Sequence, residues 1–267
     1  MPSTIESAAT AAREAFSEKM SAMSFLEHLE ELRKRIIWSI VAVGIAFLVC
    51  WHWSETIYGY MQKPIMEALQ RNHLSTKLTY LNPTEPFNMY MKIGLIAALF
   101  VASPFVLYQL WAFVAPGLYR NEKKYVVPFM VLSVGLFLGG GYFGYKVVFP
   151  AALTFLIDQG KQFTPMITIG EYTDLFLTII IGLGVVFEMP ILVFFLALIG
   201  IVSPNWMWNN FRYSILVIFI IAAILTPTTD IMNMCIFAAP MIGLYLVSIG
   251  VAWLVHPRRR RAKAEAK

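Results

Sequence analysis

The chain has 267 residues, of which 58% are hydrophobic and only 14% are charged, and its mean hydropathy is +0.66. A soluble fold of this length cannot bury so much apolar surface, so lipid must form part of the surroundings, which excludes an ordinary soluble domain. The net charge of +5 lies at the ends of apolar segments and forms no basic stripe interleaved with aromatic residues, which argues against nucleic acid as a partner.

Six apolar segments follow one another along the chain. An apolar run of about 20 residues spans the ~30 Å hydrocarbon layer as a helix, so the pattern predicts an all-α, polytopic membrane protein with six transmembrane helices. We expect the fifth and sixth helices to be short, since only residues 213–225 separate Arg212 from Thr226. The predicted spans cover residues 36–53, 89–114, 126–149, 175–200, 213–227 and 231–255.

Orientation follows from the lysines and arginines of the connections, which are retained on the cytoplasmic side during insertion. A model with both termini inside leaves few of the 21 basic residues outside, namely Lys63, Arg71, Lys77, Lys92, Lys146 and Lys161. The chain shows no internal repeat. We expect a flexible N-terminal extension over 1–22, one six-helix domain over 23–256 and a basic cytoplasmic tail over 257–267.

An amphipathic segment precedes the first span. Ser24 and Glu27 form a capping box that predicts a helix start, and the polar side of this helix carries His28 and Glu31, with Arg33 at the edge of its apolar stripe. One interpretation is that these charges form a solvated helix face whose basic residues keep this end of the chain in the cytoplasm. The other is that they form a binding surface.

Two acidic residues occupy unusual places. Glu122 is a lone acid in the basic cytoplasmic loop between the second and third spans. Glu188 lies near the middle of the fourth span, where an ionised side chain costs roughly 2.5 to 3.5 kcal/mol, so it is expected to face protein or a water-filled cavity. Pro190 can kink the helix there and free backbone carbonyls. A hydrogen bond to a neighbouring helix, a contact with a partner and a proton relay all remain open for Glu188.

The outer ends of the fifth and sixth spans carry Thr226, Asp230 and Asn233. A polar cluster that contacts a partner is one interpretation. A capped helix end is the alternative.

Four stretches of the chain carry distinctive motifs: FLEHLEELRKR at 25–35, YQLWAFVAPGLYRNEKKYVVP at 108–128, FEMP at 187–190 and LTPTTD at 225–230. Together they resemble the TatC family of the twin-arginine protein translocase. Pro64, Pro86 and Phe87 in the first outer loop add to the match, while TPTTD departs from the TPPD of many relatives and Asn233 stands where Gln is frequent.

The resemblance implies a receptor, not an enzyme, that binds twin-arginine signal peptides of folded proteins in the bacterial cytoplasmic (inner) membrane. It implies single-span TatA-type and TatB-type partners, self-association, transport driven by the proton-motive force, and no cofactor or metal. The implied signal-peptide site comprises His28, Glu31, Arg33, Phe113, Pro116 and Glu122. Glu188 is the implied intramembrane polar residue, and the implied partner contacts are Thr226, Pro227, Asp230 and Asn233.

Two other functions are compatible with the residues alone. A small ion-coupled transporter would use six spans and a buried Glu188, but predicts an internal repeat. A scaffold for other membrane subunits would need no acidic cytoplasmic site.

Overall fold

The computed structural model describes the backbone of residues 3–114, 126–226 and 230–265, and the side chains of 27–113, 128–226 and 230–254. Within these residues the chain is helical, and the only extended pairing is a single bridge between Thr79 and Thr168. The helices are α1 (Ser3–His52), α2 (Ser54–Met61), α3 (Lys63–Arg71), α4 (Glu85–Val114), α5 (Val126–Phe143), a π-helical turn (Gly144–Val148), α6 (Phe149–Gln159), α7 (Ile169–Val186), α8 (Met189–Ile199), α9 (Pro204–Asn209), α10 (Phe211–Leu225) and α11 (Ile231–Glu265).

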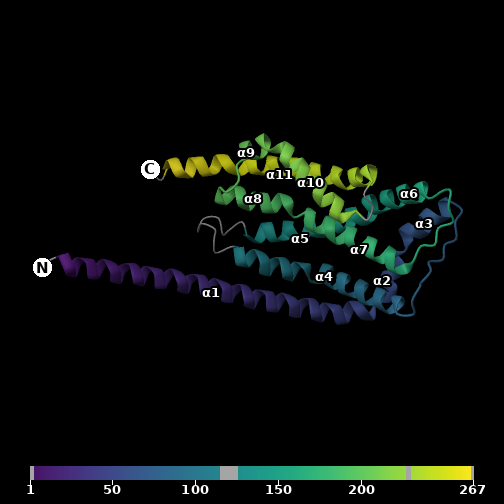
Figure 1. The fold of residues 1–267 in the computed structure, drawn as a ribbon, viewed down its shortest axis with the longest axis horizontal. Helices are drawn as coiled ribbons and strands as arrows, with labels where there is room; N and C mark the ends of the chain where they lie inside the picture. The colour runs from purple at the N-terminus through teal and green to yellow at the C-terminus, as the bar shows by residue number, and fades with distance from the viewer. Residues whose placement is uncertain (1–2, 115–125, 227–229, 266–267) are drawn as a thin grey trace.

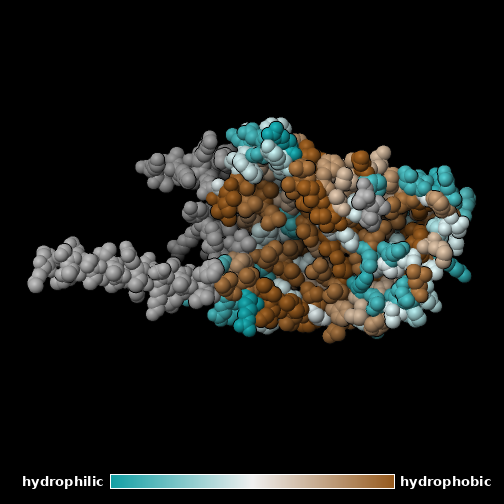
Figure 2. All heavy atoms as spheres, in the orientation of Figure 1, coloured by the Kyte–Doolittle hydropathy of each residue, from teal (hydrophilic) through white to brown (hydrophobic). Residues whose placement is uncertain are grey.

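The long helices lie side by side, and both chain ends lie at the same end of the bundle (Figure 1). Hydrophobic residues form a broad band across the face shown in Figure 2, with hydrophilic residues gathered at its right-hand end. Five segments of the described chain are long and apolar enough to cross a membrane, and α10 is a shorter sixth. The five are Glu27–His52, Glu85–Phe113, Pro128–Gln159, Ile169–Ile199 and Ile231–Leu254. The predicted all-α, six-span architecture is therefore confirmed.

The lengths of the last two spans differ from the prediction in one respect. Helix α10 has 15 residues, about 22 Å at 1.5 Å per residue, and is short as predicted. The sixth span covers 24 residues, so the expectation that it is short is wrong. The Asp230 carboxylate accepts a hydrogen bond from Asn233 N (2.7 Å). This contact caps the start of α11, and the apolar run beyond it is uninterrupted.

Helix α1 begins well before the predicted start at Ser24. Its backbone is helical from Ser3, because residues 3–23 contain many good helix formers and neither proline nor glycine. The capping-box prediction is therefore wrong. Flexibility of residues 1–22 stays a prediction, as do the proposed domain boundaries.

The fourth span is broken in the middle. Helix α7 begins at Ile169, where the Thr168 hydroxyl accepts a hydrogen bond from Glu171 N (3.2 Å). It ends at Val186, and a tight turn at Phe187 and Glu188 leads into α8. Pro190 lies in the first turn of α8, where its missing N–H costs no helical hydrogen bond. The predicted kink is thus a full break, which lies at Phe187 and Glu188 and places Glu188 between two half-helices.

Short helices close the end of the bundle opposite the two chain termini (Figure 1). Pro64 lies in the first turn of α3, and the buried Tyr172 hydroxyl of α7 donates to Met61 O of α2 (2.6 Å). Two hydrogen bonds of the Thr79 backbone join the two outer loops: Thr79 N donates to Ile167 O (3.0 Å), and Thr79 O accepts from Ile169 N (2.8 Å). Pro86 lies in the first turn of α4, and the exposed Phe87 ring packs edge-on against Trp51. These contacts hold the outer loops against the helices.

Candidate functional site

Two of the predicted signal-peptide residues meet where α1 passes α4. The His28 imidazole stacks on the Phe113 ring, with centroids 4.3 Å apart and planes 13° from parallel. His28 and Glu31 are three residues apart, so they share one face of α1. His28 Nδ1 lies 4.0 Å from Glu31 Oε2. The structure thus brings His28, Glu31 and Phe113 together at the end of the bundle that carries both termini.

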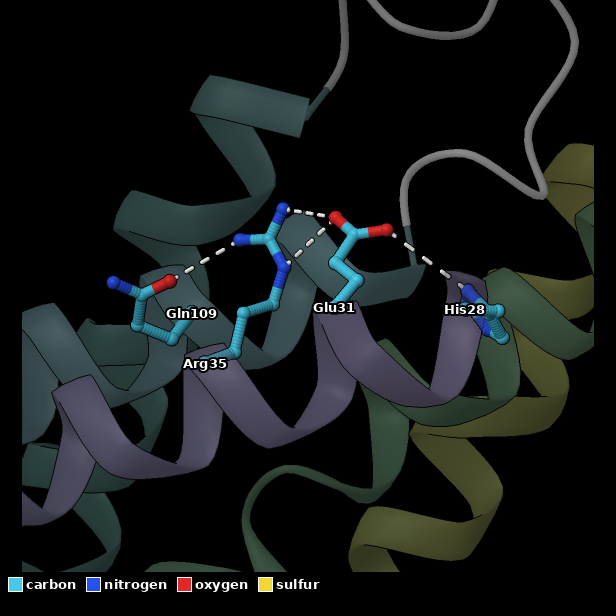
Figure 3. A network of polar contacts seen from close by, with 4 residues as sticks. All are labelled: His28, Glu31, Arg35 and Gln109. Atoms are coloured by element: carbon cyan, nitrogen blue, oxygen red, sulfur yellow. Dashed lines mark hydrogen bonds and ion pairs between the residues drawn. The ribbon is translucent and has the colours of Figure 1, made fainter. Parts of the chain in front are cut away.

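Glu31 is already bound by an arginine of the same helix. Arg35 Nε and Nη2 both donate to Glu31 Oε1, at 3.0 and 2.5 Å, while Arg35 Nη1 donates to Gln109 Oε1 of α4 (3.1 Å). Figure 3 shows the chain of contacts from His28 through Glu31 and Arg35 to Gln109. Gln109 therefore holds the Arg35 guanidinium, and Arg35 leaves Glu31 Oε2 as the open acceptor.

Of the other three residues of the predicted site, the structure describes only Arg33. Arg33 is exposed and makes no hydrogen bond or ion pair with the described residues. Pro116 and Glu122 lie in 115–125, outside the described residues. That segment follows α4 directly, and α4 carries Phe113 and Gln109 near its end.

Glu188 belongs to a second, buried cluster. Its side chain is 8% exposed, and its Oε2 accepts a hydrogen bond from the Ser133 hydroxyl of α5 (2.6 Å). The Trp111 indole N–H of α4 in turn donates to Ser133 Oγ (2.8 Å). Among the described residues, Glu188 Oε1 is buried with no hydrogen-bond partner. The cluster thus joins three helices and keeps one acceptor unused.

The outer polar residues are held mainly by the ends of their own helices. Thr226 is buried and follows α10, where its N–H donates to Ala222 O (2.9 Å). Asp230 caps α11, and Asn233 is fully buried. Pro227 lies outside the described residues. Asp230 therefore has the role of a helix cap, which was one of the two interpretations. Contact of these residues with a partner stays a prediction.

Sequence reasoning gave no role to Gln109, Trp111 or Ser133. Gln109 and Trp111 lie within the 108–128 motif, so the motif could have indicated that they belong to a functional site. Ser133 is a single serine in the apolar third span, and nothing in the sequence distinguishes it. Among the described residues, no three histidine, cysteine, aspartate or glutamate side chains gather closely enough to hold a metal ion.

Comparison with known proteins identifies the family. The family model described as Sec-independent protein translocase protein (TatC) matches residues 27–240. The chain belongs to the TatC family. It is 71% identical over 250 residues to the TatC protein of Koribacter versatilis, a match that covers 94% of this chain and 92% of that protein. It is 39% identical over 231 residues to TatC of Helicobacter pylori strain J99, covering 86% and 89%.

A solved TatC structure has the same fold. The crystal structure of a twin-arginine translocase receptor, TatC, superposes with a TM-score of 0.76 at 33% identity, and the match covers 85% of this chain and 99% of that one. The resemblance in the four motifs is therefore confirmed. The chain is a multi-pass membrane protein and a component of a Sec-independent protein translocase, which sets aside the alternative of an ion-coupled transporter.

Proposed function

We propose that this chain is the receptor subunit of a twin-arginine translocase in the bacterial inner membrane. It binds the signal peptides of folded proteins at His28, Glu31, Arg33, Phe113, Pro116 and Glu122. The observation that carries the proposal is the meeting of His28, Glu31 and Phe113 beside the start of the 115–125 loop. The solved TatC protein with the same fold is itself described as a twin-arginine translocase receptor.

The chemistry of the site suits paired arginines. A guanidinium presents parallel N–H groups that a carboxylate accepts in pairs, whereas the lysine ammonium is a point charge without this geometry. An acid among bases binds an incoming cation only where the local bases are occupied. Arg35 is held by Glu31 Oε1 and by Gln109, so Glu31 Oε2 can accept one N–H of a peptide arginine, and a paired contact with both oxygens follows when the peptide arginine displaces Arg35 from Oε1. Glu122 accepts the second.

Single-span TatA-type and TatB-type proteins are the proposed partners, together with further copies of the chain, and the proton-motive force drives transport. Helix α1 offers a surface for such contacts, because it packs mainly against α4 and leaves large apolar side chains such as Ile45 and Leu48 exposed. Thr226, Pro227, Asp230 and Asn233 are the proposed contacts at the other end. Lipid covers whatever the partners leave free.

The test measures binding of a twin-arginine peptide and its lysine–lysine variant to the detergent-solubilised protein. A charge-assisted hydrogen bond contributes about 1.5 to 3 kcal/mol, so Glu31→Gln and Glu122→Gln are each expected to weaken binding of the arginine peptide roughly ten- to a hundredfold. Both variants are also expected to lose discrimination between the two peptides.

Glu30→Gln is the matched control. Glu30 is one residue away on α1, and its carboxylate pairs with Lys34 at 2.9 Å on an exposed face, so this variant is expected to bind like the wild type. If Glu31→Gln and Glu122→Gln both keep the wild-type preference for arginine, these carboxylates do not read the peptide. Unchanged export by the variants would favour a scaffold function instead.

A further inference from the structure

A groove opens between helices near the outer end of the bundle. It has a volume of about 310 Å³ and is lined almost wholly by apolar and aromatic side chains. Four elements besides the π-helical turn contribute to it, α2, α4, α5 and α7. We define this α2–α5 groove by Tyr60, Ile96, Leu138, Tyr142, Tyr145 and Phe176.

Tyrosines form the rim of the groove. The Tyr145 hydroxyl donates to Tyr60 O (2.9 Å), which ties the π-helical turn to α2. Tyr60 and Tyr142 are 61% and 65% exposed. Tyrosine is enriched at the boundary between hydrocarbon and headgroups, because its ring is apolar and its hydroxyl is polar. The rim therefore has the composition of a membrane interface, with the apolar groove beside it.

Two lysines flank this rim. Lys63 Nζ lies 4.4 Å from the centroid of the Tyr60 ring, and Lys146 Nζ lies 5.4 Å from that of Tyr145. Neither ammonium has a carboxylate within 4 Å among the described residues. Glu67, the acid one turn after Lys63, pairs with Arg71 instead. Both ammonium groups are thus exposed beside the groove without a close ion pair among the described residues.

The backbone around Lys146 is irregular. Residues Gly144–Val148 form a π-helical turn between α5 and α6. Such turns insert an extra residue into a helix and frequently occur at functional sites. Here the turn carries both Tyr145, which lines the groove, and Lys146, which flanks it.

We propose that the α2–α5 groove binds an anionic phospholipid, with one acyl chain in the groove and the phosphate between Lys63 and Lys146. Part of an acyl chain, which is thin and flexible, fits this apolar space, whereas a helix about 10 Å across can only lie over it. Lysines near anionic lipid contribute on the order of 1 kcal/mol each, so they supply the selectivity, and the groove supplies the affinity common to all acyl chains.

The test is native mass spectrometry of the full chain, delipidated in detergent and then given equal amounts of phosphatidylglycerol and phosphatidylcholine with matched acyl chains. The wild type is expected to retain phosphatidylglycerol preferentially. Lys63→Ala and Lys146→Ala are each expected to reduce that preference about fivefold, and the double variant is expected to abolish it. The double variant Lys63→Arg/Lys146→Arg keeps both charges and is expected to keep the preference.

Two matched controls separate this site from general charge and general packing. Lys77→Ala/Lys161→Ala removes two lysines from the same side of the protein, outside the groove, and is expected to retain the wild-type preference. Ala97→Trp fills the groove and is expected to reduce retention of both lipids, whereas Leu95→Trp places the same side chain on an exposed part of α4 outside the groove and is expected to leave retention unchanged.

Equal retention of the two lipids by the wild type would overturn the proposal. So would a wild-type preference in the Lys63→Ala/Lys146→Ala variant. Melting temperatures and elution profiles like those of the wild type show that each variant is folded. If Lys63→Ala/Lys146→Ala is unstable, the single alanine variants and Lys63→Arg/Lys146→Arg still test the proposal.

Discussion

Glu188 illustrates what a single buried carboxyl does in a membrane-spanning bundle. Ser133 donates to one of its oxygens, and Trp111 donates to Ser133, so three helices meet at this residue. The second oxygen has no partner among the described residues. A buried acceptor left unpaired carries a free-energy cost, and a hydrogen-bond donor on a partner or signal peptide would remove it.

The first prediction concerns this residue. Glu188→Gln keeps an oxygen that accepts from Ser133 and adds a donor, so it is expected to retain partial export. Glu188→Leu leaves the Ser133 hydroxyl without its acceptor, at a cost of about 1 to 3 kcal/mol, and is expected to lose more export. Export of a twin-arginine reporter at matched protein levels measures both. Wild-type export by Glu188→Leu would leave Glu188 with a packing role only.

At the scale of the element, close helix packing depends on Gly140, the middle one of three consecutive glycines in α5. A Cβ on Gly140 would lie 2.7 Å from Leu183 O of α7 and 2.7 Å from the Phe187 ring, whereas a Cβ on Gly139 would meet nothing within 4 Å. Small residues let membrane helices approach each other closely. Gly140 therefore sets the approach of α5 to α7, next to the turn that carries Glu188.

The different surroundings of Gly140 and Gly139 allow a matched comparison of two alanine variants. Gly140→Ala is expected to destabilise the protein by about 1 to 3 kcal/mol, because the new methyl group meets a backbone carbonyl that cannot yield. Gly139→Ala is expected to be neutral or to stabilise by up to about 1 kcal/mol, because alanine favours helix over glycine. Thermal unfolding in detergent measures both. Equal melting temperatures for the two variants would contradict the packing argument.

The short helix α10 supports another prediction at this scale. At about 22 Å it is shorter than the hydrocarbon layer, and such mismatch thins the lipid or drives association with other helices. Insertion of four leucines after the buried Ile218 is expected to impair export. Insertion of four leucines after Trp253, near the end of the sixth span, is the control. Normal export with normal levels of the α10 variant would show that its length is unimportant.

At the scale of the whole molecule, both termini lie at one end of the bundle and the short outer helices lie at the other (Figure 1). The same end carries His28, Glu31 and Phe113, while Lys63, Lys146 and the α2–α5 groove lie toward the opposite end. The proposed peptide site and the proposed lipid site are thus on opposite sides of the membrane.

Cysteine labelling tests this arrangement in intact cells. Single cysteines are introduced into a chain in which Cys50 and Cys235 are replaced by serine. An impermeant reagent is expected to label positions 71–77 and 158–163 from outside, and to reach 120–124 and 258–263 only after permeabilisation, because the basic connections are retained inside. Reversal of either pair would contradict the six-span topology.

The sequence by itself determined the class of the protein, the number of its spans, the shortness of the fifth and a distortion of the helix near Pro190. These features follow from apolar length and from the missing N–H of proline, which are local properties. Four motifs also identified the family. The start of α1 was predicted wrongly. The residues before the capping box are good helix formers, so the helix begins ahead of the box and continues through it. The length of the sixth span was predicted wrongly too, because Asp230 caps α11 and does not shorten it.

Only the tertiary structure decided which polar groups are partners. Glu31 and Arg35 are one turn apart in the sequence, but Gln109, which holds Arg35, is 74 residues away. Ser133, which binds Glu188, is 55 residues away from it on another helix. Helix packing brings these residues together, and the spacing of residues along one helix contains no information about the side chains of its neighbour. The pairing of Tyr60 with Tyr145 at the mouth of the α2–α5 groove was decided in the same way, since only the fold places α2 beside the π-helical turn.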